Sequence, residues 1–273
     1  MKRHLSLCKW IATISFGVLF FLFLSQFLPA VGTLSNNAYL KLALLLSASI
    51  LAALLYILYV RVAERRKATE LSLKRIKDLF IGFAIGIIFI ASVVGVLYLL
   101  GVYKVYDISL PYDIMLMELA GGSIVAVTEE IIFRGVMYRM IEERFRVATA
   151  LVVTSLLFGM FHLWMVDIWC ALAIAAEAGI MLAAAYKINN NLWLPIGIHW
   201  SWNYALGPIF GWNTSGILRE GSSIFTSISE GPKFLTGATN GLEGSVVTLI
   251  IGTCLGVVLW FYATRKSKLS VES

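Results

Sequence analysis

The sequence predicts an all-α polytopic membrane protein with about eight transmembrane helices. Hydrophobic residues make up 59% of the 273-residue chain, charged residues only 14%, and the mean hydropathy is +0.84. A soluble domain needs a more polar surface, and a chain this apolar cannot stay solvated as a disordered coil. A bilayer core about 30 Å thick needs roughly 20 apolar residues per helix, and the chain divides almost completely into such stretches.

The expected spans follow one another closely, with one long segment between the last two, at 211–244. This segment is rich in Gly, Ser and Thr, which predicts a loop able to fold back over the helices. The spans cover residues 10–31, 39–60, 79–103, 114–138, 147–165, 168–186, 192–210 and 245–263. The first apolar run, of about 20 residues, exceeds the 7–15 of a signal peptide, so we expect a retained helix. Gly82 and Gly86 lie about one turn apart in the third span, and this spacing suits close helix contact.

Basic residues gather on one side of the expected membrane. Of the 22 Lys and Arg residues, 17 precede the first span or follow the second, fourth, sixth or last span. The opposite side carries Lys41, Lys104, Arg219 and Lys233. The positive-inside rule therefore places both termini in the cytoplasm, as an even number of spans requires. The net charge of +6 reflects this orientation, and we expect no nucleic-acid partner.

The cysteine content excludes a scaffold built on disulfide bonds. Cys8, Cys170 and Cys254 are few, widely spaced and located in or beside apolar stretches. We expect them to be small core residues, and they indicate no particular redox compartment.

Few ionisable side chains lie inside the expected spans, and their cost in hydrocarbon means that such groups are usually paired or functional. They are Glu118, Glu129, Glu130, Arg134, His162, Glu177 and His199, joined by the polar Asn203. Glu130 and Arg134 are i and i+4 on one helix face, in the favourable order, so we expect them to neutralise each other. Glu129 is rotated by about 100° around the helix axis from Glu130, so it can face a different helix and stay available for chemistry. His199 and Asn203 share a face of another helix.

Two acidic residues have a role that the sequence leaves open. Glu118 lies 11 residues before Glu129, almost in line with it, and either lines the same cavity or reaches outward. For Glu177 the default expectation is an interhelical hydrogen bond. The expected fifth span places His162 near its outer end, whereas Glu129 and His199 lie near mid-membrane. A common site therefore requires the fifth span to be shifted or tilted.

Three short motifs occur in order on separate expected helices. Residues 129–134 read EEIIFR, residues 158–162 read FGMFH and residues 199–203 read HWSWN. As EExxxR, FxxxH and HxxxN they resemble the motifs of the type II CAAX prenyl endopeptidases and the CPBP proteins (Abi, bacteriocin-processing), a family of intramembrane glutamic endopeptidases. The resemblance covers about residues 114–210, with a looser similarity in the glycine-rich stretch 236–244. It divides the chain into an N-terminal three-helix membrane region (1–113), a protease-like catalytic membrane region (114–263) and a cytoplasmic tail (264–273).

The resemblance implies a site in an intramembrane cavity where a glutamate and a histidine activate water for peptide hydrolysis. By motif position, Glu129 is the general base and His162 is its partner on the water. His199 and Asn203 form the oxyanion hole, whose donors act on charge that develops in the transition state. A carboxylate in a low-dielectric cavity is a stronger base than one in water, which suits this role.

The same resemblance implies the roles of the remaining motif residues and a mechanism without a cofactor. Glu130 and Arg134 support the site, in agreement with the ion pair expected from their spacing. The family mechanism uses no metal or other cofactor. The alternative that Glu129, His162 and His199 hold Zn²⁺ with an open water position also stays open, although the sequence has no HExxH motif.

Other functions and several possible substrates remain open at this stage. A proton-coupled transporter also needs intramembrane Glu and His, but the hydrophobic segments show no two-fold repeat. A catalytically silent scaffold or immunity protein can keep the same fold. As partners we expect the lipid bilayer and a peptide or lipidated protein substrate, either of the prenylated CAAX type or a bacterial peptide or leader. The expected location is a bacterial plasma membrane, and the oligomeric state is not predicted.

Overall fold

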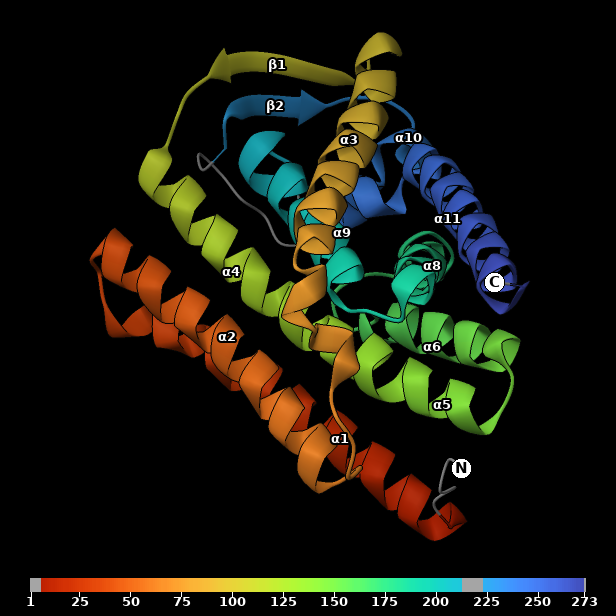
Figure 1. Cartoon of the computed structure of the whole chain (residues 1–273). Helices are drawn as coiled ribbons and strands as arrows, with labels where there is room; N and C mark the ends of the chain where they lie inside the picture. Colours follow the sequence, from red (N-terminus) through yellow and green to blue (C-terminus); the bar gives the residue numbers. More distant parts are fainter. Residues whose placement is uncertain (1–5, 213–222, 273) are drawn as a thin grey trace.

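The computed structural model describes residues 6–212 and 223–272, most of which are helical (Figure 1). The helices are α1 (Leu7–Phe27), α2 (Ala38–Val62), α3 (Lys77–Leu99), α4 (Tyr112–Glu130), α5 (Arg139–Arg144), α6 (Val147–Phe161), α7 (Ile168–Ile174), α8 (Ile180–Asn189), α9 (Trp193–Tyr204), α10 (Lys233–Thr236) and α11 (Val246–Glu272). Three π-helical segments, Ile131–Tyr138, Ala175–Gly179 and Ala205–Ile209, continue α4, α7 and α9. The strands are β1 (Tyr103–Ile108) and β2 (Phe225–Ser229).

Within the described residues, five helical stretches are long and apolar enough to cross a membrane. They are Leu7–Leu34, Ala38–Val62, Lys77–Leu99, Ile168–Asn189 and Val246–Lys266. Large apolar side chains on them face outward, among them Leu19 and Leu99, as lipid contact requires. The prediction of a helical multi-pass membrane protein is confirmed, but the count of about eight spans is not. The other three expected spans are also helical, but they are shorter or carry the charged motif residues.

A two-stranded antiparallel sheet departs from the all-helical expectation. The expected third span ends at Leu99 instead of residue 103, because the chain turns at Gly101, where φ is +73°. Tyr103 then begins β1 and pairs with Ser229 of β2, which comes from the expected loop 211–244. Figure 1 shows this pair at one end of the helical bundle, beside the end of α3. The described part of the loop therefore folds back and pairs with the segment that follows α3.

The cysteines also differ from the expectation. All three are free, but only Cys170 is buried. Cys8 and Cys254 are exposed on α1 and α11, in stretches that can span a membrane. Because the surroundings of such helices are apolar lipid, an apolar sequence context does not by itself predict a place in the core.

Helices α3 and α9 pack closely because glycines line their contact. A Cβ on Gly82 would lie 2.3 Å from the carbonyl oxygen of Leu194, and one on Gly197 would lie 2.2 Å from that of Leu79. A Cβ on Gly86 would lie 2.0 Å from Oγ of Ser201. Gly82 and Gly86 therefore face α9, the helix that carries the third motif, and their small size sets how near α9 lies.

Helix α6 is shorter than the expected span 147–165. It ends at Phe161, and His162 is its C-cap. Its 15 residues, at about 1.5 Å per residue, are too short for a bilayer core about 30 Å thick. The Asp167 side chain then accepts a hydrogen bond from the Cys170 N–H and starts α7. His162 therefore lies at the end of a short helix, and it lines the same cavity as Glu129 and His199.

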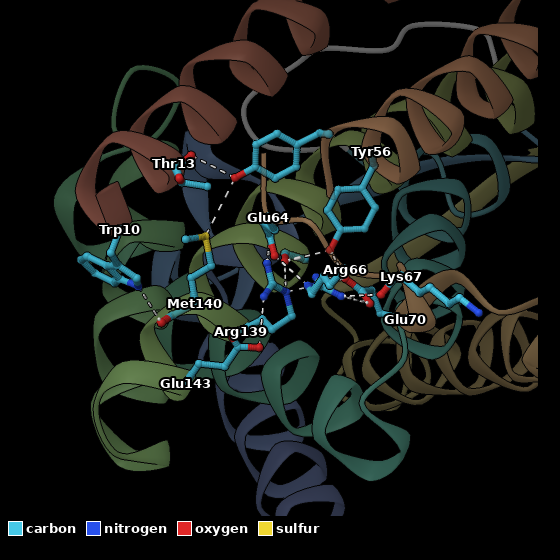
Figure 2. A network of polar contacts seen from close by, with 12 residues as sticks. Trp10, Thr13, Tyr56, Glu64, Arg66, Lys67, Glu70, Arg139, Met140 and Glu143 are labelled. Atoms are coloured by element: carbon cyan, nitrogen blue, oxygen red, sulfur yellow. Dashed lines mark hydrogen bonds and ion pairs between the residues drawn. The ribbon is translucent and has the colours of Figure 1, made fainter. Parts of the chain in front are cut away.

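The first two helices form a hairpin along α4, and ion pairs fasten it at one end (Figures 1 and 2). Arg66 donates to both oxygens of Glu70 at 2.5 and 2.9 Å and to Glu64 at 2.7 Å. Arg139 donates to Glu64 at 2.5 Å. The Tyr56 hydroxyl contacts Glu70 and lies 2.9 Å from the carbonyl oxygen of Gly135, in the π-helical segment after α4. The network therefore fixes the N-terminal helices against the long helix that carries the tandem glutamates.

Candidate active site

Glu130 lies at the end of α4 in a fully buried position. Its Oε1 accepts a hydrogen bond from Nη1 of Arg134 at 2.9 Å, so the pair expected from i, i+4 spacing is formed. The same oxygen lies 3.0 Å from Nδ1 of His199 on α9. Glu130 thus joins its own helix to the helix of the third motif.

Arg134 extends this connection to two further segments. Its Nη2 donates to the carbonyl oxygens of Ala178 at 3.4 Å and Gly179 at 3.2 Å, where a π-helical turn leads into α8. Its guanidinium carbon lies 4.6 Å from the ring centre of Phe158 on α6, within the range of a cation–π contact. Arg134 is 1% exposed, so these contacts replace the water that a buried guanidinium lacks.

His199 lies between the two glutamates. Nδ1 faces Glu130, and Nε2 lies 3.9 Å from Oε2 of Glu129. That Glu129 oxygen is buried and has no hydrogen-bond partner among the residues that the structure describes. A carboxylate oxygen of this kind can accept a hydrogen bond from a bound water or an amide that enters beside it.

His162 follows the last residue of α6, and its ring orientation is set by its own helix. Nδ1 lies 2.8 Å from the carbonyl oxygen of Phe158. Because a carbonyl oxygen only accepts, Nδ1 carries the hydrogen in this contact, and Nε2 is left as the acceptor nitrogen. An unprotonated Nε2 suits a residue that holds a water molecule by one of its O–H groups.

Residues of all three motifs line one cavity of about 370 Å³. Glu129, His162, His199 and Asn203 all line it. Glu130 and Arg134 are not among its described lining residues, so they stand behind the wall and hold His199. The volume is sufficient for several water molecules, each of which takes about 30 Å³ in the liquid.

Glu118 and Glu243 also line the cavity, whereas Glu177 does not. Glu118 lines the same cavity as Glu129 and does not reach outward, which decides between the two alternatives that the sequence left open. Glu243, from the segment before α11, lies in the wall as well. The sequence gives little indication that Glu243 lines a cavity, because a single acidic residue in a glycine-rich stretch is typical of a surface turn. Glu177 is fully buried outside the lining, and its two oxygens have no hydrogen-bond partner in the described part of the chain, so the default interhelical hydrogen bond is absent.

The zinc alternative fits this arrangement poorly. Among residues 6–212 and 223–272, no group of three or more His, Cys, Asp and Glu side chains is placed to hold a metal ion. No catalytic step is therefore derived through a metal.

A comparison with protein families gives an independent assignment of the same region. Residues 111–205 match the family model of the type II CAAX prenyl endopeptidase Rce1-like proteins. The match covers about a third of the chain and includes all three motifs. No curated protein and no solved structure matches the chain significantly. The match confirms the resemblance seen in the motifs: residues 111–205 form a domain of the Rce1-like family of type II CAAX prenyl endopeptidases, a family of proteases.

Proposed function

We propose that the protein is an intramembrane endopeptidase that hydrolyses a peptide bond with water activated by Glu129 and His162. The observation that supports this proposal most directly is the single cavity lined by Glu129, His162, His199 and Asn203. These side chains come from three helices and meet in a helical membrane protein that otherwise has few polar residues in its apolar stretches. Such a concentration is costly in hydrocarbon and is typical of a functional site.

In the first step a water molecule binds between Glu129 and Nε2 of His162. Glu129 accepts one proton of the water, and the water oxygen attacks the carbonyl carbon of the scissile bond. A positioned base of this kind contributes about 10²–10⁴-fold to the rate. The carbonyl oxygen then carries the negative charge of a tetrahedral intermediate.

His199 and Asn203 stabilise this oxyanion. Asn203 donates through its side-chain amide, and His199 donates through Nε2 while its Nδ1 donates to Glu130. With protons on both nitrogens, the ring is an imidazolium held by the Glu130 carboxylate. Removal of one such donor costs about 10²–10³-fold in kcat in well-studied hydrolases.

The intermediate collapses when the carbon–nitrogen bond breaks. Glu129 returns the proton that it took from water to the leaving amine, so one water is consumed and a carboxyl and an amine are released. Glu129 thus serves as base in the first step and as acid in the second, and it ends the cycle ionised. No cofactor takes part.

The proposed substrate is a peptide or lipidated protein that enters from the bilayer or its interface. Two classes remain as the proposed substrate: a prenylated CAAX-type protein and a bacterial peptide or leader. The proposed location is a bacterial plasma membrane with both termini in the cytoplasm, on the strength of the basic residues at that side. The proton-coupled transporter stays the alternative if no peptide is cleaved.

Purified protein in detergent should cleave a farnesylated CAAX peptide, the same peptide without the farnesyl group, or a leader peptide. Glu129→Gln keeps the size of the side chain and removes the base, so it should lose activity and remain folded. The matched control is Glu143→Gln, because Glu143 is half exposed on the continuation of the same helix and lies outside the cavity lining. Full activity of Glu129→Gln, or loss of activity with a metal chelator, would overturn the mechanism.

A further inference from the structure

A glycine-rich strap, residues 237–244, connects α10 to α11 and contributes Glu243 to the cavity wall. Gly237 and Gly241 have φ of +72° and +77°, a region that favours glycine. A Cβ on Gly237 would lie 1.7 Å from the carbonyl oxygen of Gly241. The strap therefore follows a path that its glycines specify, and this path places the side chains of Asn240 and Glu243.

Asn240 fastens the strap to the turn that follows His162. Its Nδ2 donates to Oδ2 of Asp167 at 2.8 Å, and its Oδ1 accepts from the Asp167 N–H at 3.1 Å. The Cys170 N–H and the Asn240 amide lower the pKa of Asp167, which keeps this carboxylate ionised as an acceptor. The carbonyl oxygen of His162 accepts from the N–H groups of Met165 and Val166, so the turn between His162 and Asp167 is itself hydrogen-bonded.

Glu243 fastens the same strap to α9. Its Oε1 accepts a hydrogen bond from Nε1 of Trp202 at 3.2 Å, and both residues are buried. Trp202 is three residues after His199 and directly before Asn203. The ring of Trp202 also packs on Phe89 of α3, with the ring centres 4.9 Å apart. The indole is thus held at its N–H by Glu243 and at its face by α3.

The strap is anchored at its far end on α11. The carbonyl oxygen of Leu242 accepts from Oγ1 of Thr248 at 2.7 Å, and Oγ of Ser245 accepts from the Val247 N–H at 3.2 Å. One short segment therefore connects the His162 turn, the helix with His199 and Asn203, and the last helix.

We propose that Glu243 is a positioning residue of the peptidase site: by holding Trp202 it fixes Asn203 and His199 relative to His162 across the cavity. This inference rests on the function proposed above and adds to it. Glu243 itself touches no reacting atom in this scheme. What it supplies is an oxygen acceptor at a fixed place, so an amide oxygen can replace the carboxylate oxygen.

Kinetics of two Glu243 variants test the proposal. Glu243→Gln keeps an acceptor for the indole N–H and should keep kcat close to the wild-type value. Glu243→Leu removes it and should lower kcat by about 100-fold with little change in KM, as expected for a misplaced catalytic group. Trp202→Phe, which removes the donor and keeps an aromatic ring, should behave like Glu243→Leu. The matched control is Glu230→Gln, an exposed glutamate in the same outer segment.

The indole N–H resonance of Trp202 gives a second reading that does not depend on activity. It is the resonance that disappears in Trp202→Phe, and it should keep its hydrogen-bonded shift in Glu243→Gln and move upfield in Glu243→Leu. Wild-type kcat in folded Glu243→Leu, or an unmoved resonance in that variant, would overturn the proposal. Equal loss of kcat in the Gln and Leu variants would also overturn it, because the charge of Glu243 would then matter and not its acceptor. If the wild-type protein cleaves no peptide, the proposed function fails, while the resonance still decides whether Glu243 holds Trp202.

Discussion

Oε1 of Glu130 lies 3.0 Å from Nδ1 of His199, a contact between residues 69 positions apart in the chain. The same oxygen accepts from Arg134, so one buried carboxylate serves the first and third motifs together. Glu130 is fully buried, and a charge in such a place is tolerated only with close partners. The second glutamate of the tandem therefore holds the site, and the first is left to act in the cavity.

Arg134→Ala should destabilise the protein more than any change in the cavity lining. It leaves Glu130 buried without its guanidinium partner, and breaking a buried ion pair costs about 3–5 kcal/mol. Denaturant unfolding in mixed micelles would measure the loss. Adding Glu130→Gln to Arg134→Ala should recover part of it, because the stranded charge is removed. An unchanged unfolding midpoint in Arg134→Ala would show that the pair contributes nothing.

His162→Ala should have the opposite profile, with a large loss of activity and a small loss of stability. Among the residues that the structure describes, the ring makes one hydrogen bond, to Phe158 near the end of its own helix, and a bond of this kind contributes about 1 kcal/mol. The loss of its contact with the attacking water should lower kcat by about 10²–10⁴-fold. Met160→Ala is the control, because Met160 is exposed on the same helix and outside the cavity lining. Equal activity of the two variants would contradict the role of His162.

The sequence predicts the local contacts of the site well, because helix geometry alone determines them. Glu130 and Arg134 are one turn apart, and any regular helix brings them together. The cavity that His162 shares with Glu129 is different, since it depends on how helices distant in sequence pack together. Apolar residues continue through Met165, so hydropathy extends the span beyond the end of the helix at Phe161.

Two other features could not be predicted because they depend on contacts distant in sequence. The pairing of Tyr103 with Ser229 has no local signal, and the segment around β1 continues an apolar stretch. The place of Glu243 in the cavity wall results from the path of the strap and from Trp202 on another helix. A sequence pattern assigns a residue to a helix face, but not to a wall built from several segments.

Gly86→Ala should disturb the site through helix packing. The new methyl group would meet Oγ of Ser201 and the carbonyl oxygen of Ile198, so α9 must move away from α3. Overpacking of this kind costs about 1–3 kcal/mol. Because Ser201 lies between His199 and Asn203, kcat should fall as well. Thermal unfolding and peptide cleavage would measure the two effects.

Gly95→Ala is the matched control for that substitution. Gly95 lies on the same helix, and outside that helix's own backbone no atom of the described residues is within 4 Å of a Cβ built there. Alanine is favoured over glycine in a helix by about 0.5–1 kcal/mol, so this variant should be as stable as wild type or slightly more stable. If both variants behave alike, the glycine contact with α9 does not set the position of that helix.

The ion-pair network at the end of α2 should make stability depend on pH. Burial disfavours the charge of Glu70, but the hydrogen bonds and charge of Arg66, with Tyr56 and Arg139, outweigh it and hold the Glu70 pKa below its ordinary value of 4.5. The folded protein therefore binds this proton less readily than the unfolded chain. The stabilisation is complete above the ordinary pKa and is lost as the pH falls through the folded pKa.

Unfolding temperatures measured from pH 7 to pH 3 test this dependence. Glu70→Gln should unfold at a lower temperature than wild type at pH 7, and the gap should narrow as the pH falls below the ordinary carboxyl range. Glu230→Gln, which alters an exposed pair with Lys104, should follow the wild-type curve closely. A constant gap across the range would mean that Glu70 acts through its shape and not through its charge.

Glu177→Met should leave the protein as stable as wild type, or more stable. Glu177 is fully buried, neither carboxyl oxygen has a hydrogen-bond partner in the described residues, and Gly252 of α11 packs against its Cβ. Methionine has a similar length without a branch near the Cβ, and removal of an unsatisfied buried polar group gains about 1–3 kcal/mol. Peptide cleavage should be unchanged, because Glu177 is not among the described residues of the cavity wall. A folded Glu177→Met variant that cleaves no peptide would contradict this expectation and show that the buried carboxyl is needed for activity.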